Sequence, residues 1–312
     1  MAVHVVDVLE MVEIAEQNSD LATSFPQPSQ GQIQPLAQAT AIRQRDVTLY
    51  TWGDEESGEV LDWLYLSSAK VHQLIFGLPV GGWFRHSDEF RTIFAADEVL
   101  IVLEGTMACT HPVSGETHRV TEGEAVFFRR DTWHHAYAVG DGPLRVLEFF
   151  APPPAAGAAG PYARAQPLLT DVRLADDARL GNYVPCVDEP VDGQITTLRA
   201  EDRLWRLEEA EPSPLLMGIF ASTEHITVGE LNLRDGQLTP WRTHSGDLCG
   251  YVSKGRLRIA VDGPDARRWL ELESGDGFYV PEGVQYRYQA YSGAVHAYWA
   301  VAPSYEPHAG MA

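Results

Sequence analysis

Short apolar segments alternate with turn residues along most of the chain. Segments rich in Val, Leu, Ile, Phe, Tyr and Trp are separated by Gly, Pro, Asp and Ser at intervals of roughly 8 to 12 residues, which is typical of short β-strands. The clearest predicted strands lie in EVLIVLEG, GEAVFFRRD, LRVLEFFAP, GRLRIAVDG, GDGFYVPEG and VHAYWAVAP. Helical periodicity is weak and is confined to the first ~20 residues and to DARRWLELE, where a strand explains the pattern equally well. The pattern predicts an all-β chain.

The stretch APPPAAGAAGPYARAQP, residues 151–167, interrupts this pattern, and its Pro, Ala and Gly content is typical of a link between domains. The segments on its two sides repeat each other at shifts of 150 to 155 residues, pairing Ser67 with Ser222, Gly81 with Gly236, Gly105 with Gly255 and Gly123 with Gly275. One unit therefore occurs twice. We predict an N-terminal arm (1–45), a first domain (46–152), a connecting segment (153–200) and a second domain (201–304).

Charge and segment composition limit the classes of partner. The 312 residues include 44 Asp and Glu against 23 Lys and Arg, a formal charge of -21, which disfavours nucleic acid and anionic membrane surfaces as partners. The first residues, MAVHVVDVLEMVEIAEQ, lack the basic start of a secretion signal, and no apolar run reaches the ~18 residues of a membrane span. Three cysteines without a CxxC pair indicate reduced packing residues. These features predict a cytoplasmic protein.

Motifs in each half resemble those of the cupins. The first cupin motif ends in Glu, six residues and Gly, which Glu98 to Gly105 matches, and Gly123 to His134 resembles the second motif. The chain departs from the second motif at three positions, where Arg129, Asp131 and Ala138 replace Pro, Gly and Asn. The second copy keeps three residues of the same motif, Gly275, Pro281 and Gly283. The resemblance covers roughly residues 70–150 and 220–302.

This resemblance implies a bicupin, with two tandem cupin jelly-roll β-barrels in which inward side chains from facing strands converge on one cavity. Neighbouring side chains of a strand point to opposite faces. We therefore expect His134, at the motif position, to face the interior of the first barrel, and His135 to face outward.

In the first barrel, the resemblance implies that Glu98 and His134 are metal ligands, and either residue is a candidate for catalytic proton transfer. The H-x-H pair that metal-binding cupins typically use is absent, so His86 in the preceding loop is the candidate third ligand. Such a set suits a divalent ion of Fe, Mn, Ni, Cu or Zn. Arg91, in the same loop, is a candidate for substrate binding. The alternative is a hydrogen-bonded Glu98 and His134 pair in a metal-free pocket.

In the second barrel, Arg242 and His244 stand where the H-x-H would lie, Leu248 replaces the Glu, and Tyr286 replaces the His. One imidazole without a carboxylate holds a transition metal poorly, so we expect no metal here. Arg242, His244 and Tyr286 are candidates for binding a carboxylate or phenol substrate. The alternative is that they satisfy one another in a purely structural barrel.

These features favour a small-molecule enzyme. The chain lacks the G-x-S-x-G, P-loop, G-x-G-x-x-G, H-E-x-x-H and EF-hand motifs. By resemblance, bicupins include oxygenases, isomerases, decarboxylases and cyclases, and we expect oxidative, isomerising or cyclising chemistry on an aromatic or oxygenated organic acid, by analogy alone. Two alternatives stay open: a metal-free ligand-binding or sensory protein, and a structural partner of another enzyme. The resemblance also suggests a homodimer.

Overall fold

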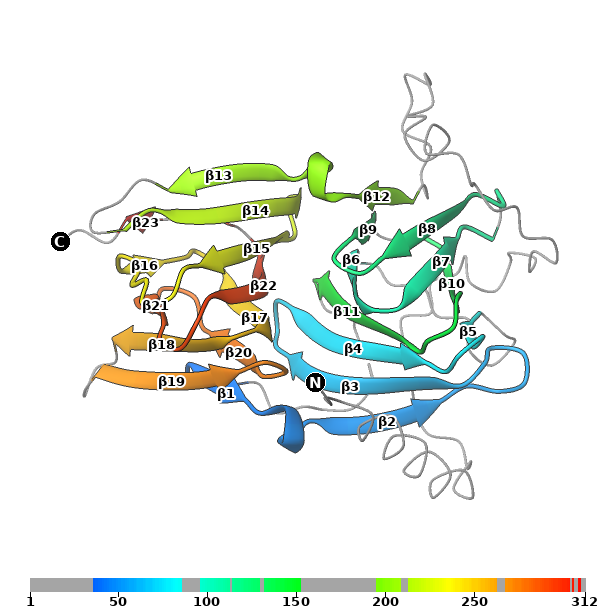
Figure 1. Ribbon diagram of the computed structural model, residues 1–312, viewed down its shortest axis with the longest axis horizontal. Helices are drawn as coiled ribbons and strands as arrows, with labels where there is room; N and C mark the ends of the chain where they lie inside the picture. Colours follow the sequence, from blue (N-terminus) through cyan, green and yellow to red (C-terminus); the bar gives the residue numbers. More distant parts are fainter. Residues whose placement is uncertain are drawn as a thin grey trace.

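The computed structural model describes residues 36–85, 96–112, 114–129, 132–152, 195–208, 213–262, 267–303, 305 and 308–309. These residues form strands joined by turns, and their helical elements are two 3-10 turns, η3 (Gln44–Asp46) and η5 (Ala200–Asp202). None of the described segments is a helix with the length and apolar character of a membrane span. The prediction of an all-β chain is confirmed (Figure 1).

The first barrel is built from two antiparallel sheets. Its large sheet has the strand order β12-β9-β6-β11-β4-β3-β2 and its small sheet the order β5-β10-β7-β8. In chain order the strands are β2 (Thr48–Trp52), β3 (Val60–Ser67), β4 (His72–Leu78), β5 (Trp83–Phe84), β6 (Asp97–Glu104), β7 (Thr106–Thr110), β8 (Thr117–Thr121), β9 (Ala125–Phe128), β10 (His135–Ala138), β11 (Leu144–Ala151) and β12 (Thr196–Leu198).

The second barrel repeats this plan. Its large sheet has the order β1-β20-β17-β22-β15-β14-β13 and its small sheet the order β19-β18-β21-β16-β23. Its strands are β1 (Thr40–Ile42), β13 (Leu204–Glu208), β14 (Leu215–Ser222), β15 (Thr227–Leu233), β16 (Arg242–Thr243), β17 (Asp247–Lys254), β18 (Arg256–Asp262), β19 (Arg267–Glu273), β20 (Gly277–Val280), β21 (Tyr286–Ala290), β22 (Val295–Ala302) and β23 (His308–Ala309). The prediction of two tandem jelly-roll barrels is confirmed.

The repeat extends to the backbone of the turns. Gly105 follows β6 with a φ of 83°, and Gly255 follows β17 with a φ of 87°. A side chain at either glycine would also meet a backbone oxygen, that of Pro143 in the first barrel and that of Ala294 in the second. Glycine is required at both positions because it alone combines this conformation with so close an approach.

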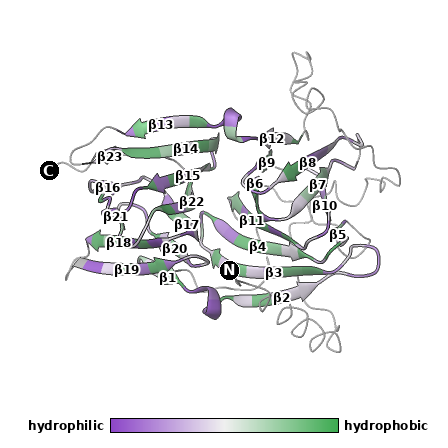
Figure 2. Cartoon of the chain, viewed as in Figure 1, coloured by the Kyte–Doolittle hydropathy of each residue, from purple (hydrophilic) through white to green (hydrophobic). Residues whose placement is uncertain are grey.

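Each barrel receives one edge strand from the segment that precedes the other barrel. β1 lies before the first barrel in sequence but pairs with β20 of the second, through Thr40 to Tyr279. β12 lies before the second barrel but pairs with β9 of the first, through Thr196 to Phe127. The hydrophilic turns η3 and η5 follow these strands and lead into β2 and β13 (Figure 2). The barrels are therefore linked by a reciprocal exchange of edge strands.

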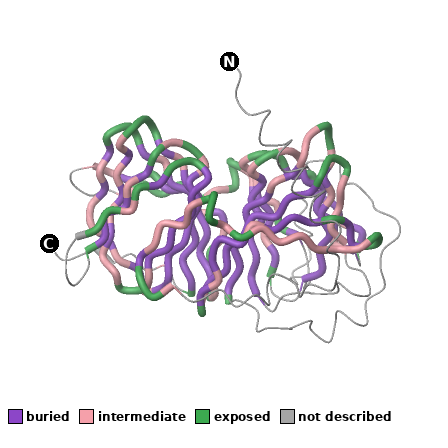
Figure 3. Tube along the Cα trace, turned by 90° about the horizontal axis from the view of Figure 1, so that it is seen from below, coloured by how far each residue is buried: buried purple, intermediate pink, exposed green. Residues whose placement is uncertain are grey.

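The large sheets of the two barrels pack against each other through a shared apolar layer. One buried cluster fills each barrel interior, and a third contains residues of both barrels, including Val99 and Ile101 of β6 with Cys249 and Tyr251 of β17. Figure 3 shows the buried strands side by side between the barrels. Alternate residues of β6 therefore point into the barrel or into this shared layer, which explains its nearly continuous apolar sequence.

Candidate functional site

Five titratable side chains on separate segments face the interior of the first barrel. They are Asp62 on β3, His72 on β4, Glu98 on β6, His134 just before β10, and Glu148 on β11, and all five are buried. Strand alternation accounts for their direction, because their neighbours two residues away, such as Leu64, Leu74, Leu100, Ala136 and Val146, belong to the interior cluster. The barrel therefore combines an apolar wall with a group of acids and imidazoles.

Glu98 and His134 form the closest contact in this group. Glu98 Oε2 lies 3.8 Å from His134 Nε2. His134 Nδ1 lies 3.3 Å from the carbonyl oxygen of Thr132. Since a carbonyl only accepts, the network assigns the ring proton to Nδ1 and leaves the Nε2 lone pair facing Glu98. The imidazole also stacks on Phe128, with ring centroids 4.4 Å apart, so its orientation is fixed.

Burial keeps both members of this pair neutral. It raises the pKa of Glu98 well above its ordinary value, and the neighbouring acids Glu148 and Asp97 add to the rise. Burial also lowers the pKa of His134 to about 4, with a smaller contribution from His111. At neutral pH and without a bound cation, the pair is a carboxylic acid beside a neutral imidazole.

The other three members, Asp62, His72 and Glu148, belong to no sequence motif and were not predicted. Burial raises the pKa of Asp62 to about 7, although Trp52 Nε1 donates a 2.7 Å hydrogen bond to its carboxyl group. Burial, followed by the charge of Asp62, raises the pKa of Glu148 to about 8. Burial lowers the pKa of His72 to about 3, and its ring stacks on Phe150 at 4.3 Å. The available signal was a single polar residue at an inward position of an otherwise apolar strand.

The described residues contain one group of three side chains within metal-ligand reach of one another: Asp97, Glu224 and His225. Arg129 forms ion pairs with two members of this group, with Nη1 3.1 Å from Asp97 and Nη2 2.5 Å from Glu224. The group is thus an ion-pair network that joins the two barrels. His86 and Arg91 lie outside the described residues, so their candidate roles in metal and substrate binding stay predictions.

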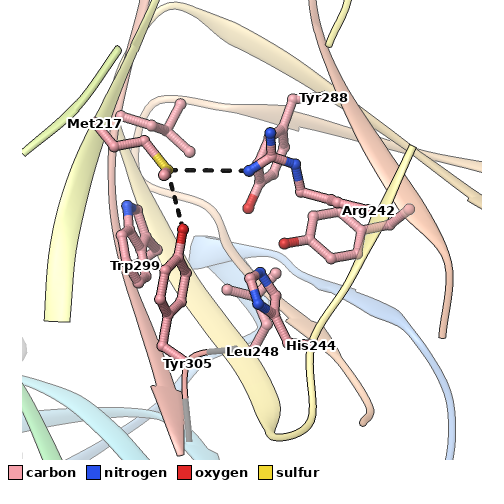
Figure 4. Close-up of a pocket in the computed structure, with 9 residues that line it drawn as sticks. Met217, Arg242, His244, Leu248, Tyr288, Trp299 and Tyr305 are labelled. Atoms are coloured by element: carbon pink, nitrogen blue, oxygen red, sulfur yellow. Dashed lines mark hydrogen bonds between the residues drawn. The ribbon is translucent and has the colours of Figure 1, made fainter. Parts of the chain in front are cut away.

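In the second barrel, the three candidate residues Arg242, His244 and Tyr286 line one small cavity. Figure 4 labels Arg242 and His244 among the side chains that surround it. The other lining residues are Met217, Leu231, Leu248, Tyr288, Trp299 and Tyr305. The cavity volume is only about 10 Å³, which leaves room for about one water molecule. Aliphatic and aromatic side chains fill the rest of this interior.

The cation of this cavity is already paired. Arg242 Nη2 lies 2.9 Å from Glu208 Oε2, and the hydroxyl of Tyr305 donates to Glu208 Oε1 at 3.0 Å. Arg242 Nη1 lies 3.9 Å from the sulfur of Met217. Burial raises the pKa of Tyr286 well above its ordinary value, so its phenol is neutral. The barrel therefore offers hydrogen-bonding groups but no unbalanced positive charge to a carboxylate.

The strand pairing aligns the cavity of the second barrel with the titratable group of the first. Phe150 pairs with Glu98 as Val301 pairs with Leu248, and the same matching of ladders holds across the large sheets. The matched pairs are Asp62 with Met217, His72 with Thr227, Glu98 with Leu248, His134 with Tyr286, and Glu148 with Trp299. In the second barrel, each position that matches a titratable residue of the first interior thus holds an uncharged residue.

His135 points away from this interior but is not exposed. It pairs with Thr110 of β7. Its side chain lies on the face of β10 opposite the core residues Ala136 and Ala138. Only 2% of its surface is accessible, and burial followed by the charge of His134 lowers its pKa to about 3. The two adjacent histidines are therefore both neutral, on opposite sides of the sheet.

The comparisons with known proteins agree with this architecture. The family model described as "Cupin domain" matches residues 79–150 and 229–301. An oxalate decarboxylase of Lactobacillus farciminis, solved as a formate complex, is 13% identical with a TM-score of 0.59, and the match covers 92% of each chain. A putative glyoxylate-induced protein of Pseudomonas aeruginosa is 15% identical with a TM-score of 0.60, covering 89% of this chain and 93% of that one.

An oxalate decarboxylase of Bacillus subtilis, studied for its Mn(II) centres, is 14% identical with a TM-score of 0.58, and the match covers 96% of this chain and 85% of that one. Searching the curated protein sequences gives no match. Identities this low establish the shared fold and nothing finer. The cupin model matches the chain twice, the two barrels have the same strand order, and the structural neighbours share this fold. The chain therefore belongs to the cupins and is a two-domain member, a bicupin.

Proposed function

We propose that this bicupin is a small-molecule enzyme whose active centre lies in the first barrel, at Glu98 and His134. The observation that carries the proposal is their geometry: a buried carboxyl oxygen and an imidazole nitrogen 3.8 Å apart, brought together from β6 and the turn before β10. Perturbed acid and base groups that converge in an enclosed interior are typical of active sites.

A divalent metal ion fits this pair. Glu98 Oε2 is buried and accepts no hydrogen bond from any described residue. A carboxylate oxygen and an imidazole nitrogen bind first-row divalent ions at about 2.0–2.2 Å, so ligand atoms 3.8 Å apart can share one ion. The inward positions of β3, β4, β6 and β11 carry no Lys or Arg, so a cation would also balance the acidic interior. Glu98 and His134 would hold Fe, Mn, Ni, Cu or Zn, with further ligands from outside the described residues or from substrate.

Such an ion, when bound, would polarise a substrate oxygen or activate dioxygen. The chain's own residues do the rest. Phe128 and the Thr132 carbonyl hold the His134 ring in one orientation, and the apolar wall excludes water. Glu148, whose pKa burial raises to about 8, can give or take a proton near neutral pH. An organic acid is the substrate class that complements a cation in this barrel, and oxidative, isomerising or cyclising chemistry on an aromatic or oxygenated acid is the reaction we propose.

A panel of small organic acids tests this function, with oxygen uptake and product analysis on protein loaded separately with each metal. We expect turnover that Glu98→Gln and His134→Ala abolish. Tyr286→Phe, at the matched position of the second barrel, is the control and should keep it. Turnover that persists in both first-barrel variants, or that is lost only in Tyr286→Phe, would contradict the proposal.

One observation favours a second candidate, a metal-free binding protein. Among the described residues of the first interior, no three side chains lie within metal-ligand reach of one another, and the two ligands Glu98 and His134 are fewer than metal sites usually have. In that case, the wild-type protein would bind organic acids without converting them, and His134→Ala would weaken binding alone. Calorimetric titration of protein freed of metal by a chelator, with the same panel of organic acids, distinguishes the two candidates.

A further inference from the structure

Three polar side chains form a hydrogen-bonded row on the second barrel, outside both interiors. Ser253 Oγ lies 2.5 Å from His296 Nδ1, and His296 Nε2 lies 2.8 Å from Glu230 Oε2. The residues come from β17, β22 and β15, which are adjacent strands of the large sheet. A hydroxyl, an imidazole and a carboxylate in this order make up the arrangement of a nucleophile, its base and the group that orients the base.

The hydrogen-bond partners assign the protons. The Glu230 carboxylate only accepts, so Nε2 of His296 carries the ring proton and Nδ1 has the lone pair. The Ser253 hydroxyl is then the donor toward Nδ1, with the carbonyl oxygen of His296 as a second acceptor at 3.1 Å. The imidazole is therefore in the protonation state of a general base for this hydroxyl.

Burial increases from the hydroxyl end of the row to the carboxylate end. Ser253 is partly exposed, the His296 side chain is 24% exposed and the Glu230 side chain is 3% exposed. Arg203 Nη1 lies 2.8 Å from the other oxygen of Glu230, so an ion pair fixes the carboxylate beneath the ring. Asn232 stands opposite His296 in the ladder and supplies an amide on the same face. Solvent-borne molecules can reach the hydroxyl while the orienting carboxylate stays enclosed.

The fold itself does not require this row. Ser253 occupies the irregularity between Val252 and Lys254, where the register of β17 against β22 shifts, and such bulges re-aim side chains. The first barrel has the same ladder but holds Leu103, Arg145 and Ile75 at the positions matched to Ser253, His296 and Glu230. A barrel of this type therefore forms without the row, and the second copy alone carries it.

We propose that Ser253, His296 and Glu230 form a serine acyl-transfer site for small, solvent-accessible esters. Ser253 Oγ attacks the ester carbonyl while His296 Nδ1 takes the hydroxyl proton. The ester C–O bond then breaks, the alcohol leaves with that proton, and the acyl group stays on Ser253. His296 then takes a proton from water, whose oxygen attacks the acyl carbon. The bond between the acyl carbon and Ser253 Oγ breaks, His296 gives the proton to Oγ, and the carboxylic acid leaves. The site is independent of the metal centre proposed for the first barrel.

The test uses the full chain with a fluorophosphonate probe and p-nitrophenyl acetate. We expect one covalent adduct per chain, located on Ser253 by peptide mass spectrometry, and ester hydrolysis that falls at least about 100-fold in Ser253→Ala and in His296→Gln. Glu230→Gln should lower the rate of labelling and shift its pH profile. Ser222→Ala removes a hydroxyl that bonds only Thr227 among the described groups and is the matched control, which should behave as wild type.

Absence of an adduct in the wild-type protein, or labelling and hydrolysis that Ser253→Ala leaves unchanged, would overturn the proposal. Ser253→Ala removes a single partly exposed oxygen, and a thermal unfolding curve verifies that the variant is folded.

Discussion

The two barrels share one strand order but differ in what fills them. The first places three carboxyl groups and two imidazoles among apolar side chains, whereas the second has Met, Thr, Leu, Tyr and Trp at the matched positions. In the second barrel the large rings leave room for about one water molecule, and its buried Arg242 is neutralised by Glu208. The fold is therefore maintained by apolar and aromatic packing, and the titratable group of the first barrel is an addition that stability does not require.

The largest expected effect is a loss of packing in the second barrel. Trp299 is 2% exposed and stacks on Tyr305 with ring centroids 5.1 Å apart. Trp299→Ala should lower the free energy of unfolding by about 3 to 5 kcal/mol, because a large cavity replaces the indole. Urea unfolding followed by circular dichroism measures the change. A loss below about 1 kcal/mol would mean that the second barrel is not tightly packed.

A carboxyl group moved to the second barrel should be nearly as disruptive. Leu248→Glu puts the residue type of Glu98 into the second interior, where Tyr286 stands at the position matched to His134. We expect it to lower the free energy of unfolding by about 2 to 4 kcal/mol, because the carboxyl group loses its hydration in a tightly packed interior whose cation, Arg242, is already paired with Glu208. Leu248→Met, which keeps the volume, is the control and should cost less than about 1.5 kcal/mol. Equal losses in both variants would show that polarity is not the cause.

The buried acids of the first barrel should make the stability of the protein depend on pH. The pKa values of Asp62 and Glu148, about 7 and 8, lie above their ordinary values, so the folded protein holds protons that the unfolded chain has released. These two acids therefore lower the free energy of unfolding, and they lower it further as the pH rises toward their pKa values in the folded protein. The buried imidazoles, whose pKa values are lowered, act in the opposite direction but only below about pH 6.5, the ordinary histidine value.

As the pH rises from 6.5 to 8, protein freed of metal by a chelator should thus lose about 1 to 3 kcal/mol of its free energy of unfolding. Urea unfolding at several pH values measures the slope, and Asp62→Asn combined with Glu148→Gln should flatten it. Stability that is constant or rises over this range would contradict the burial of these acids in their protonated form.

The smallest expected effect concerns one hydroxyl. Tyr286→Phe keeps the ring that packs beside His244 and Tyr288 and removes only the phenolic oxygen. We expect a change in the free energy of unfolding within about 1 kcal/mol and unchanged metal content. A large drop in metal content would mean that the second barrel, and not the first, holds the ion.

Sequence reasoning predicted the parts of this structure that depend on local patterns. Alternation and turn residues predicted the strands, and the shift of 155 residues between Ser67 and Ser222 predicted the repeat. The exchange of β1 and β12 was not predictable, because a three-residue strand carries no signal for the edge it pairs with. The predictions of a homodimer, of a cytoplasmic location and of the domain bounds remain untested.

For the site, motif spacing identified Glu98 and His134, which the structure brings together. It did not identify Asp62 or Glu148, because an isolated acid in a strand belongs to no motif and only the closed barrel shows that it faces inward. Nor could it reveal that Arg242 is paired with Glu208, since the two residues are distant in sequence and meet through the fold.

Metal content measures the difference between the two barrels most directly. Plasma mass spectrometry on protein purified without chelators or a histidine tag, beside His134→Ala, Glu98→Gln and Tyr286→Phe, is the decisive experiment. We expect about one equivalent of Fe, Mn, Ni, Cu or Zn per chain, retained in Tyr286→Phe and reduced at least about 10-fold in the two first-barrel variants. Metal near zero in the wild-type protein, or metal that His134→Ala leaves in place, would contradict a metal centre at Glu98 and His134.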